Sequence, residues 1–366
     1  MKKIIFLSLL ICTTMQAQVT IEQSKHDNDI KLSTLPYYSF GKGIGITSPD
    51  SLFQFNIRFR LQNRATYIKN DGERAAYDGQ IRRLRLRFDG YVGNPKFLYA
   101  IQLSFAPGDV GEIKEGENIN IIRDAVIFYR PNKHWNISFG QTKLPGNRQR
   151  VNSSGGLQLT DRTINNAKFT IDRDFGFQFH NMNEFKDKFS YNFKGAVSTG
   201  EGRNVTGKSD DGVAVTGKIE LLPFGAFAKD GTYFEGDVMR EPKPKLMLSG
   251  AFQQNNHARR TQGQLGNDLF EQRTMKSVLL DAMLKYRGFA AMMSYMSRTT
   301  NENAVTFNPD DLTESNYAYV GNGFDYQLSY NLKSNYEFIG RYSTQNVGDD
   351  IQAIAPNTRE IYFGVK

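Results

Sequence analysis

The sequence predicts an all-β chain that folds as a transmembrane antiparallel β-barrel, and the clearest observation is the alternating run from Phe53 to Arg64. In this run every odd position as far as Leu61 is apolar, and every even position is polar or cationic. A period of two gives a strand one apolar face and one wet face. A soluble sandwich would bury the phenylalanines, whereas a membrane barrel turns them to lipid and lines a water-filled lumen with the arginines.

The connections between the predicted strands also favour the barrel, because they alternate in length as in outer-membrane barrels. The short connections are 93–96, 131–133, 183–188, 287–288 and 333–335. The long connections, which are charged and rich in glycine, are 69–79, 107–120, 199–212, 255–273, 299–316 and 345–358.

Residues 1–17 have the pattern of a secretory signal peptide, which is the third observation. Two lysines precede an apolar run from Ile4 to Ile11, and Ala17 provides the small residue before the expected cleavage. The run is shorter than the roughly 20 residues that a membrane-spanning helix needs. Cys12 raises the alternative of a lipoprotein, but the isoleucine before it is too large for that cleavage. The mature chain therefore has no cysteine, which excludes disulfides and thiolate chemistry.

Residues 18–39 are polar and irregular, and we interpret them as a flexible N-terminal lead. Residues 40–366 read as one barrel domain, because no linker interrupts the series of alternating runs. We count about 14 strands, if the first two runs form one continuous strand. The predicted strands are 43–47 with 52–67, 80–92, 97–106, 121–130, 135–141, 175–182, 189–198, 213–222, 246–253, 275–286, 289–297, 324–331, 336–344 and 359–366.

Two rows of three arginines follow the wet faces of the first two strands. If these strands are neighbours in a hairpin, the rows lie about 5 Å apart. Guanidiniums so close repel one another unless anions enter, and a narrow lumen lined by them concentrates anions and rejects cations. The rows are Arg58, Arg60 and Arg64, and Arg83, Arg85 and Arg87, with Lys194 and Lys218 as further inward candidates on later strands.

A structural role for the arginines is the alternative, because barrel interiors often pair such rows with carboxylates. The carboxylates that could provide these pairs are Asp89, Asp124, Glu220, Asp281, Asp325 and Glu337. A surplus of inward positive charge would favour an anion path, and near neutrality would favour the structural role.

Residues 142–172 form the third long connection, which begins as a basic segment followed by hydroxyl and amide groups. We predict an infolded third loop that narrows the lumen and brings its polar side chains near a passing solute. A cation next to a hydroxyl suits an oxyanion. The candidates are Lys143, Arg148, Arg150 and Ser153 or Ser154. The alternative is an external flexible loop.

Six short runs carry a resemblance to a known family, in order and spacing, from about Gly43 to the end. They are Arg82 to Leu86, Tyr99 to Phe105, Arg123 to Ala125, Phe139 to Pro145, Asp161 to Thr163 and Arg173 to Gln178. In these runs the chain resembles the phosphate-selective porin O and P family of Gram-negative outer membranes. The resemblance implies a 16-stranded homotrimeric porin with a basic ladder along its channel and a constriction formed by the third loop. The positions that match this pattern are Arg58, Arg60, Arg83, Arg85, Lys143 and Arg150.

The end of the sequence departs from the family pattern. Outer-membrane barrels usually finish on a terminal aromatic residue, whereas this sequence stops at Lys366. With 14 strands counted and 16 implied, either a terminal hairpin is missing or the barrel closes with 14 strands.

We therefore expect an outer-membrane porin that lets anions diffuse passively, with phosphate or polyphosphate implied by the resemblance. The alternative is a non-conducting scaffold or adhesion barrel, whose lumen is plugged by the third loop and by arginine–carboxylate pairs. Passive transport needs no cofactor. The expected partners are small inorganic anions such as phosphate, membrane lipid and, from the resemblance, two further copies of the chain.

Enzymatic and nucleic-acid functions are not indicated. The four histidines lie far apart, and no nucleophile, phosphate-loop or zinc-ligand pattern is present. We therefore expect no catalytic residue and no metal site. The formal net charge of +8 does not predict a nucleic-acid partner, because the basic residues lie on strand faces behind a secretory signal.

Overall fold

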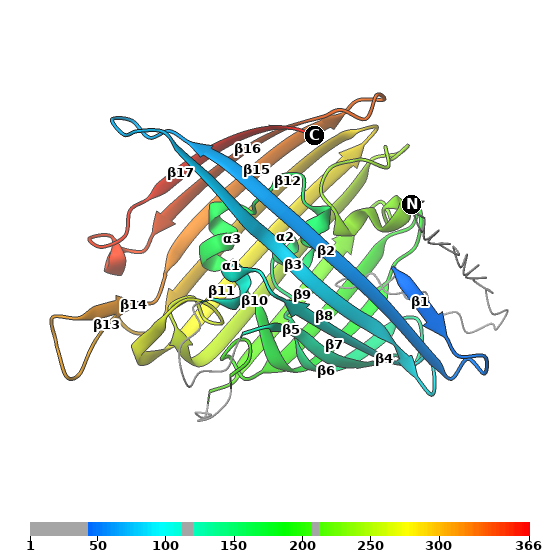
Figure 1. Cartoon of the computed structure of the whole chain (residues 1–366), viewed down its shortest axis with the longest axis horizontal. Coiled ribbons are helices and arrows are strands. Elements are labelled where there is room, and N and C mark those ends of the chain that lie inside the picture. The colour runs from blue at the N-terminus through cyan, green and yellow to red at the C-terminus, as the bar shows by residue number, and fades with distance from the viewer. Residues whose placement is uncertain (1–42, 112–119, 206–211) are drawn as a thin grey trace, which may run out of the picture.

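One antiparallel sheet of 15 strands makes up most of the structure (Figure 1). The computed structural model describes residues 43–111, 120–205 and 212–366. The predicted signal peptide and the predicted N-terminal lead lie outside these ranges. The strands of this sheet are β1 Ile44–Thr47, β2 Phe53–Ile68, β3 Ala76–Val92, β4 Phe97–Ser104, β5 Ile122–Tyr129, β6 Trp135–Lys143, β7 Arg173–Asn183, β8 Ser190–Ser198, β9 Ala214–Leu222, β10 Lys245–Arg260, β11 Asp268–Tyr286, β12 Phe289–Thr300, β15 Gly321–Asn331, β16 Glu337–Val347 and β17 Thr358–Val365.

The order of hydrogen-bonded neighbours follows the chain from β1 to β17, so consecutive strands pair antiparallel. The all-β antiparallel prediction is confirmed. Two short strands, β13 Val305–Phe307 and β14 Ser315–Tyr317, form a separate hairpin in the connection between β12 and β15. The helical segments are α1 Pro107–Val110, α2 Arg148–Val151, η2 Ser154–Gly156, α3 Ile164–Phe169, η3 Ala228–Tyr233 and η4 Asp349–Ile351. In the described part of the chain, no helix combines the length and the apolar character needed to cross a membrane.

The prediction that the first two runs form one continuous strand is wrong. A turn separates them, in which Leu52 N and the hydroxyl of Ser48 both donate to the carboxylate of Asp50. The chain then reverses, so that β1 pairs with β2 and Ile44 lies opposite Ile57. The other predicted strands each correspond to one observed strand, so the described sheet has 15 strands against the 14 counted and the 16 implied by the resemblance.

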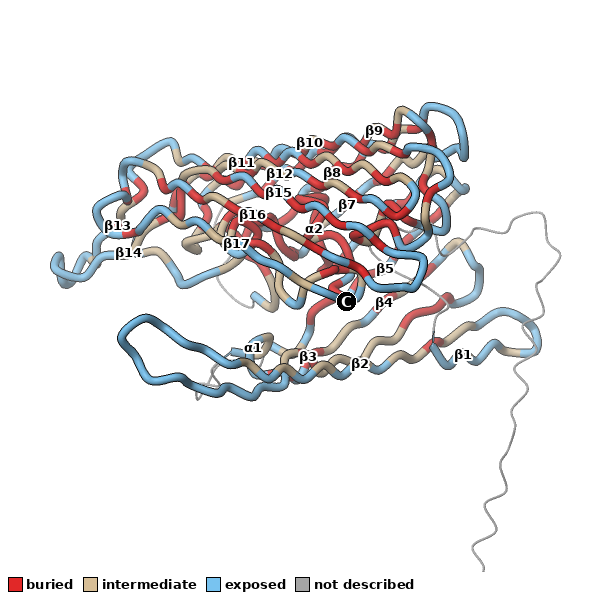
Figure 2. The backbone as a smooth tube through the Cα atoms, turned by 90° about the horizontal axis from the view of Figure 1, so that it is seen from above, coloured by how far each residue is buried: buried red, intermediate tan, exposed pale blue. Residues whose placement is uncertain are grey.

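The two faces of the sheet are inverted relative to a soluble protein, as β15 illustrates. Its outward residues are apolar, with Leu328 56% exposed, whereas the inward Asp325, Gln327 and Asn331 are each 5% exposed or less. Figure 2 shows buried and exposed segments alternating along the strands. Large apolar side chains outside and polar side chains inside are the pattern of a barrel whose outer face meets lipid.

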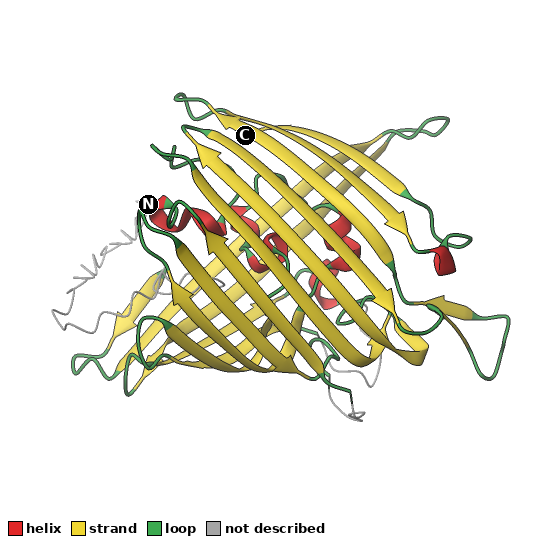
Figure 3. Cartoon of the chain, turned by 180° about the vertical axis from the view of Figure 1, so that it is seen from behind, coloured by secondary structure: helices red, strands yellow, loops and turns green. Residues whose placement is uncertain are grey.

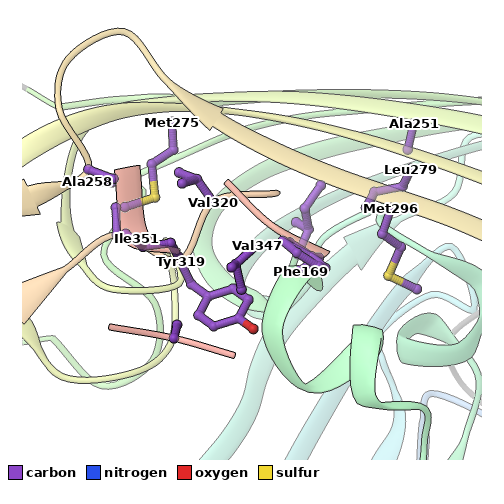
Figure 4. Packing of buried hydrophobic residues seen from close by; sticks show 14 of the residues in the cluster. Phe169, Ala251, Ala258, Met275, Leu279, Met296, Tyr319, Val320, Val347 and Ile351 are labelled. Atoms are coloured by element: carbon purple, nitrogen blue, oxygen red, sulfur yellow. The ribbon is translucent and has the colours of Figure 1, made fainter. Parts of the chain in front are cut away.

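The loop between β6 and β7, residues 144–172, lies on the inner side of the sheet (Figure 3). Its α3 helix begins at a Thr163 cap, whose hydroxyl accepts a hydrogen bond from Asn166 N. Phe169 at the end of α3 is completely buried, and its ring lies 5.5 Å from that of Tyr319. Figure 4 shows this apolar cluster between the loop and the strand walls, including Met296 and Val347. The cluster fixes one side of the loop inside the barrel.

The connections alternate in length around the barrel, with one exception. The connections from β3 to β4, β5 to β6, β7 to β8, β11 to β12 and β15 to β16 are short turns on one rim. The connection from β9 to β10 belongs to the same rim by strand direction, yet it spans residues 223–244 and contains η3. A barrel strand order alone does not require such a long segment at this rim.

Candidate functional site

The two predicted arginine rows lie side by side. In the pairing of β2 with β3, Arg58 stands opposite Arg87 and Arg60 stands opposite Arg85. The prediction that the rows are neighbours in a hairpin is therefore confirmed. Directly opposed cross-strand residues have Cβ atoms about 5 Å apart, and like charges in such pairs are destabilising. The hairpin consequently needs other groups that balance this repulsion.

A cavity of about 250 Å³ lies in front of this hairpin. Strands β2 to β7 and the loop 144–172 provide its walls. Its lining residues are Arg58, Phe59, Arg60, Arg85, Arg87, Gln102, Arg123, Asp124, Lys143, Arg150, Ser153, Ser154, Arg162 and Arg173. Seven of the predicted site residues are among them, namely Arg58, Arg60, Arg85, Arg87, Lys143, Arg150 and Ser153.

Asp89 balances the charge of the opposed pair Arg58 and Arg87. Its Oδ1 accepts hydrogen bonds from Arg87 Nε at 3.1 Å and from Arg58 Nη2 at 3.3 Å, and its side chain is completely buried. Asn56 Nδ2 donates to the Asp89 carbonyl at 3.2 Å. One carboxylate is thus shared by two opposed guanidiniums, which leaves them with a net positive charge.

Asp109 of α1, in the connection between β4 and β5, balances the charge of a second pair of guanidiniums. Arg85 Nη2 lies 2.7 Å from its Oδ2, and Arg123 pairs with its Oδ1. The Ser104 hydroxyl donates a further bond to Oδ2 at 2.7 Å. Burial by itself would raise the pKa of Asp109, but the charges of Arg123 and Arg85 hold that pKa below its ordinary value. The carboxylate therefore stays ionised at neutral pH.

The third group of pairs joins the barrel wall to the loop. Arg173 Nε donates to Asp124 Oδ1 at 2.9 Å, and its Nη1 lies 3.5 Å from Asp172. Arg150 of the loop forms a two-pronged pair with the Asp172 carboxylate. Burial by itself would raise the pKa of Asp172, but Arg150 and Arg173 hold it well below its ordinary range. This carboxylate fixes Arg150 at the edge of the cavity.

Three lining cations have no carboxylate at ion-pair distance among the described residues. Arg60 donates to the Ser154 hydroxyl at 2.8 Å. Lys143 Nζ and Arg162 Nη2 both donate to the Asn152 carbonyl, at 3.1 and 3.3 Å. Neutral oxygens of the loop thus satisfy these donors without cancelling their charge.

The cavity has a surplus of positive charge in the part of the chain that the structure describes. Nine lining side chains are cationic, and only four carboxylates pair with them, which leaves five positive charges unbalanced. Burial, followed by repulsion from Arg150, lowers the pKa of Arg162 well below its ordinary value. Crowded cations of this kind bind anions in preference to cations.

Two further predicted residues, Arg83 and Arg148, lie outside the lining of the cavity. Arg83 hydrogen-bonds the Gln62 amide on the neighbouring strand. Arg148 Nη2 lies 3.6 Å from Glu235 Oε1 on the connection between β9 and β10. Both side chains are almost completely buried, with residue exposures of 3% and 6%.

Arg64, also outside the lining, takes part in a bridge made by Asp161 of the loop. Arg64 Nη1 and Arg82 Nη2 each lie 2.6 Å from the Asp161 carboxylate. On the other side, Arg341 of β16 donates to the Asp161 carbonyl at 3.0 Å. One loop residue therefore contacts strands from both ends of the chain.

Lys194 and Lys218 are buried on the wall away from the cavity and share Glu220. Their Nζ atoms lie 2.5 and 3.2 Å from its carboxylate. Lys218 also donates to the carbonyl of Gly146 at 2.8 Å, so it tethers the start of the loop to β9. The structure thus separates these two lysines from the seven predicted residues that it brings together.

The third loop itself begins two residues later than predicted. Thr142 and Lys143 belong to the end of β6, where they pair with Asp174 and Arg173 of β7. Lys143 consequently extends into the cavity from the barrel wall, and Arg150, Ser153 and Ser154 extend from the loop.

Sequence reasoning missed Arg123, Arg162 and Arg173 as lining residues. Gln102 pairs with Asp124 and Leu103 pairs with Ile122, so Arg123 is the extra residue of a β-bulge. A bulge interrupts alternation and re-aims a side chain. The adjacent Arg123 and Asp124 consequently both lie inside, which alternation alone excludes. The runs around all three arginines had already marked the family resemblance, and that was the available signal.

A family model described as phosphate-selective porin O and P matches residues 53–264, which is more than half of the chain. The matched part contains both arginine rows, the loop 144–172 and the segment 223–244. No curated protein matches the sequence.

The chain is also similar to three solved structures of other proteins. The outer membrane channel DcaP of Acinetobacter baumannii is 13% identical, with 83% of this chain and 82% of that chain covered and a TM-score of 0.43. The anion-selective porin from Comamonas acidovorans is 12% identical, with 85% and 83% covered and a TM-score of 0.47. OmpT of Vibrio cholerae is 10% identical, with 86% and 96% covered and a TM-score of 0.40.

Proposed function

The chain belongs to the phosphate-selective porin O and P family, and we propose that it conducts anions through the arginine-lined cavity. Membership of this family makes it an outer-membrane channel of a Gram-negative bacterium rather than an enzyme. The permeant solutes that fit this cavity are phosphate and polyphosphate, which move by passive diffusion. The observation that carries the proposal is the surplus of five positive charges around one cavity.

Charge surplus supports anion selectivity for an electrostatic reason. Clefts lined by one sign of charge with low-dielectric walls raise the local concentration of the opposite ion. Conduction also requires several weak sites rather than one strong one. The opposed Arg58–Arg87 and Arg60–Arg85 pairs, with Lys143 in the same lining, provide such a series.

Phosphate in particular is favoured by the types of donor in the cavity. A guanidinium presents a planar fork that matches two oxygens of one phosphate group, and a lysine adds a point charge. Ser153 and Ser154 add hydroxyl groups beside Arg60 and Arg85. Chloride can use the charge but not the fork, so the two anions can be separated by experiment.

The proposal includes two features carried over from the sequence and the family. We propose that the signal peptide 1–17 is removed and that the mature chain assembles as a homotrimer. Size-exclusion chromatography with light scattering in detergent measures the oligomer directly. A monomer would leave the channel proposal intact and remove the trimer.

The test is the reversal potential of the full-length protein in a planar bilayer under a KCl gradient, with phosphate titrated in. We expect an anion-selective potential and a chloride current that phosphate blocks. Arg60→Ala removes a cation with no described carboxylate partner and is expected to shift the potential toward zero, whereas the exposed turn variant Lys333→Ala is the matched control. A cation-selective potential would overturn the proposal, and absence of current would favour the plugged scaffold or adhesion barrel.

A further inference from the structure

The connection between β9 and β10 is the unexpected feature of the short-turn rim. Residues 223–244 occupy a position where the neighbouring turn is the dipeptide Arg287–Gly288. Three carboxylates of this segment, Glu235, Asp237 and Glu241, are only 3%, 1% and 2% exposed. Buried carboxylates are costly unless they are paired or hydrogen-bonded, so their contacts show what the segment is built to bind.

Glu235 binds the loop 144–172. Its Oε1 accepts a bond from Gln149 Nε2 at 3.0 Å, and its Oε2 accepts one from Gln158 N at 2.8 Å. The backbone of the same residue donates to the Gly156 carbonyl at 2.7 Å. Arg148 of α2 adds a charge contact at 3.6 Å. Four groups of the loop therefore converge on one residue of the segment.

Lys285 of β11 and the turn after it bind the other side of the segment. Lys285 Nζ donates to the carbonyls of Gly231 and Phe234 at 2.7 and 2.9 Å and lies 4.4 Å from the centre of the Phe234 ring. Gly288 N donates to Asp237 at 2.6 Å. The segment is thus held between the strand wall and the loop, inside the short-turn end of the barrel.

We propose that residues 223–244 form a second constriction element, which docks on the third loop through Glu235 and closes the half of the lumen that faces β9 to β16. Anions then pass only through the arginine-lined cavity. This inference rests on the proposed function, because it explains why a barrel of this width has one selective path. Barrels with about 16 strands otherwise leave an open aqueous lumen.

The proposal partitions the lumen into a closed half and a selective path. This partition matters for selectivity, because the closed half would make a poor selectivity filter. Its walls carry both signs of charge, with Glu220, Asp281 and Asp325 against Lys218, Lys285 and Arg298, all buried. A path along such walls attracts neither ion strongly. Undocking the segment should therefore open a wider and less selective passage beside the selective one.

The test uses a triple variant that can be switched within one sample. Glu235→Ala removes the acceptors of Gln149 and Gln158, while Gly156→Cys with Phe234→Cys allows the contact to be relocked by oxidation. A Cβ atom at Gly156 would lie 3.0 Å from that of Phe234, close enough for a disulfide after a small shift. The only native cysteine, Cys12, lies in the predicted signal peptide.

Neutral sugar flux into liposomes and reversal potential are measured in the reduced and oxidised states. We expect the reduced protein to show at least about a doubling of sugar flux, as for two parallel paths, and a reversal potential nearer zero. Oxidation should restore the flux and the potential of the unsubstituted barrel. Equal sugar flux in the two states, or no crosslink in the membrane-inserted protein, would overturn the partition.

This experiment distinguishes a failure of the proposed anion channel from a failure of the proposed partition. If the unsubstituted channel is not anion-selective, the proposed function fails while sugar flux still reports the partition. If it is selective and the redox state changes nothing, only the partition fails. Phe234→Cys removes the ring contact with Lys285 in both states, whereas Asp237, Glu241 and the backbone carbonyls that accept from Lys285 are unchanged, so the attachment to the strand wall does not differ between the reduced and oxidised states.

Discussion

The guanidinium of Arg60 donates a hydrogen bond of 2.8 Å to the hydroxyl of Ser154, a residue 94 positions further along the chain. Arg85, which stands opposite Arg60 in the hairpin, reaches the same oxygen at 3.4 Å. Two cations thus share one neutral acceptor contributed by the loop. An incoming oxyanion would meet the same two donors together with the hydroxyl proton.

Ser154→Ala should separate charge from hydrogen bonding in the cavity. The five unbalanced charges remain, so the chloride-to-potassium permeability ratio should not change. Phosphate loses one hydroxyl partner, and a net hydrogen bond of about 1 kcal/mol corresponds to a block about fivefold weaker. The measurement is the phosphate concentration that halves the chloride current, with Ser329→Ala on β15 as the control. An unchanged blocking concentration would place the phosphate site elsewhere.

Arg85→Ala and Arg83→Ala should differ although they are neighbours on one strand face. Arg85 lines the cavity, whereas Arg83 bonds Gln62 outside it. A unit charge about 4 Å from an anion contributes about 1 kcal/mol in water, which is about a fivefold change in permeability ratio. We expect this change in the reversal potential of Arg85→Ala and a smaller one for Arg83→Ala. Equal shifts would show that both arginines face the permeant ion.

The Asp172 carboxylate should make the constriction resistant to acid. Its pKa is held well below its ordinary value, so its contribution to stability is complete above that value and is lost only as the pH falls through the lowered pKa. Chloride selectivity should therefore stay constant from about pH 5 to pH 8, where this carboxylate remains ionised.

Asp172→Asn imitates the protonated form and supplies the control for this pH dependence. Breaking a buried pair by removing one partner costs about 3–5 kcal/mol. We expect the variant to unfold at lower urea concentration, as read from gel mobility, and to show an altered selectivity already at pH 7, because Arg150 is released and one negative charge is removed. A variant as stable as the unsubstituted barrel would contradict the assigned role of the pair between Asp172 and Arg150.

Lys218→Met should reveal a tether rather than a conduction site. Lys218 was predicted in the anion path, but its ammonium is bound to Glu220 and to the Gly146 carbonyl. Removing it breaks a buried pair, so the free energy of unfolding should fall by about 3–5 kcal/mol, although Lys194 still pairs with Glu220. The chloride-to-potassium ratio should change less than in Arg60→Ala. A larger selectivity loss than in Arg60→Ala would return Lys218 to the path.

For regular strands, the alternation of polar and apolar residues was sufficient for much of the sequence-based prediction. It gave the paired rows of β2 and β3, because both strands keep a period of two through Arg58, Arg60, Arg85 and Arg87. It also gave the loop as the source of Arg150 and the two serines, since the long basic connection follows β6 directly.

The alternation could not predict bulges or contacts between residues that are distant in sequence. In the hairpin of β2 and β3, Gln62 pairs with Arg83 and Asn63 pairs with Ile81. Arg82 is therefore an extra residue of β3, and the alternation of β3 shifts there. That shift brings Arg82 to the face that Arg64 shares, and both guanidiniums contact Asp161. The partners of Asp161 and Glu235 lie far away in sequence, and no local pattern identifies them.

The bridge at Asp161 also bears on how the barrel assembles. Its carboxylate binds Arg64 near the start of the described chain, and its carbonyl accepts from Arg341, which lies 180 positions after it. Contacts between residues so distant form late, because the chain must close large loops before they stabilise anything. The loop is therefore anchored on both sides only when β16 has reached Asp161, and a half-assembled barrel has not yet fixed the loop that lines the proposed anion path.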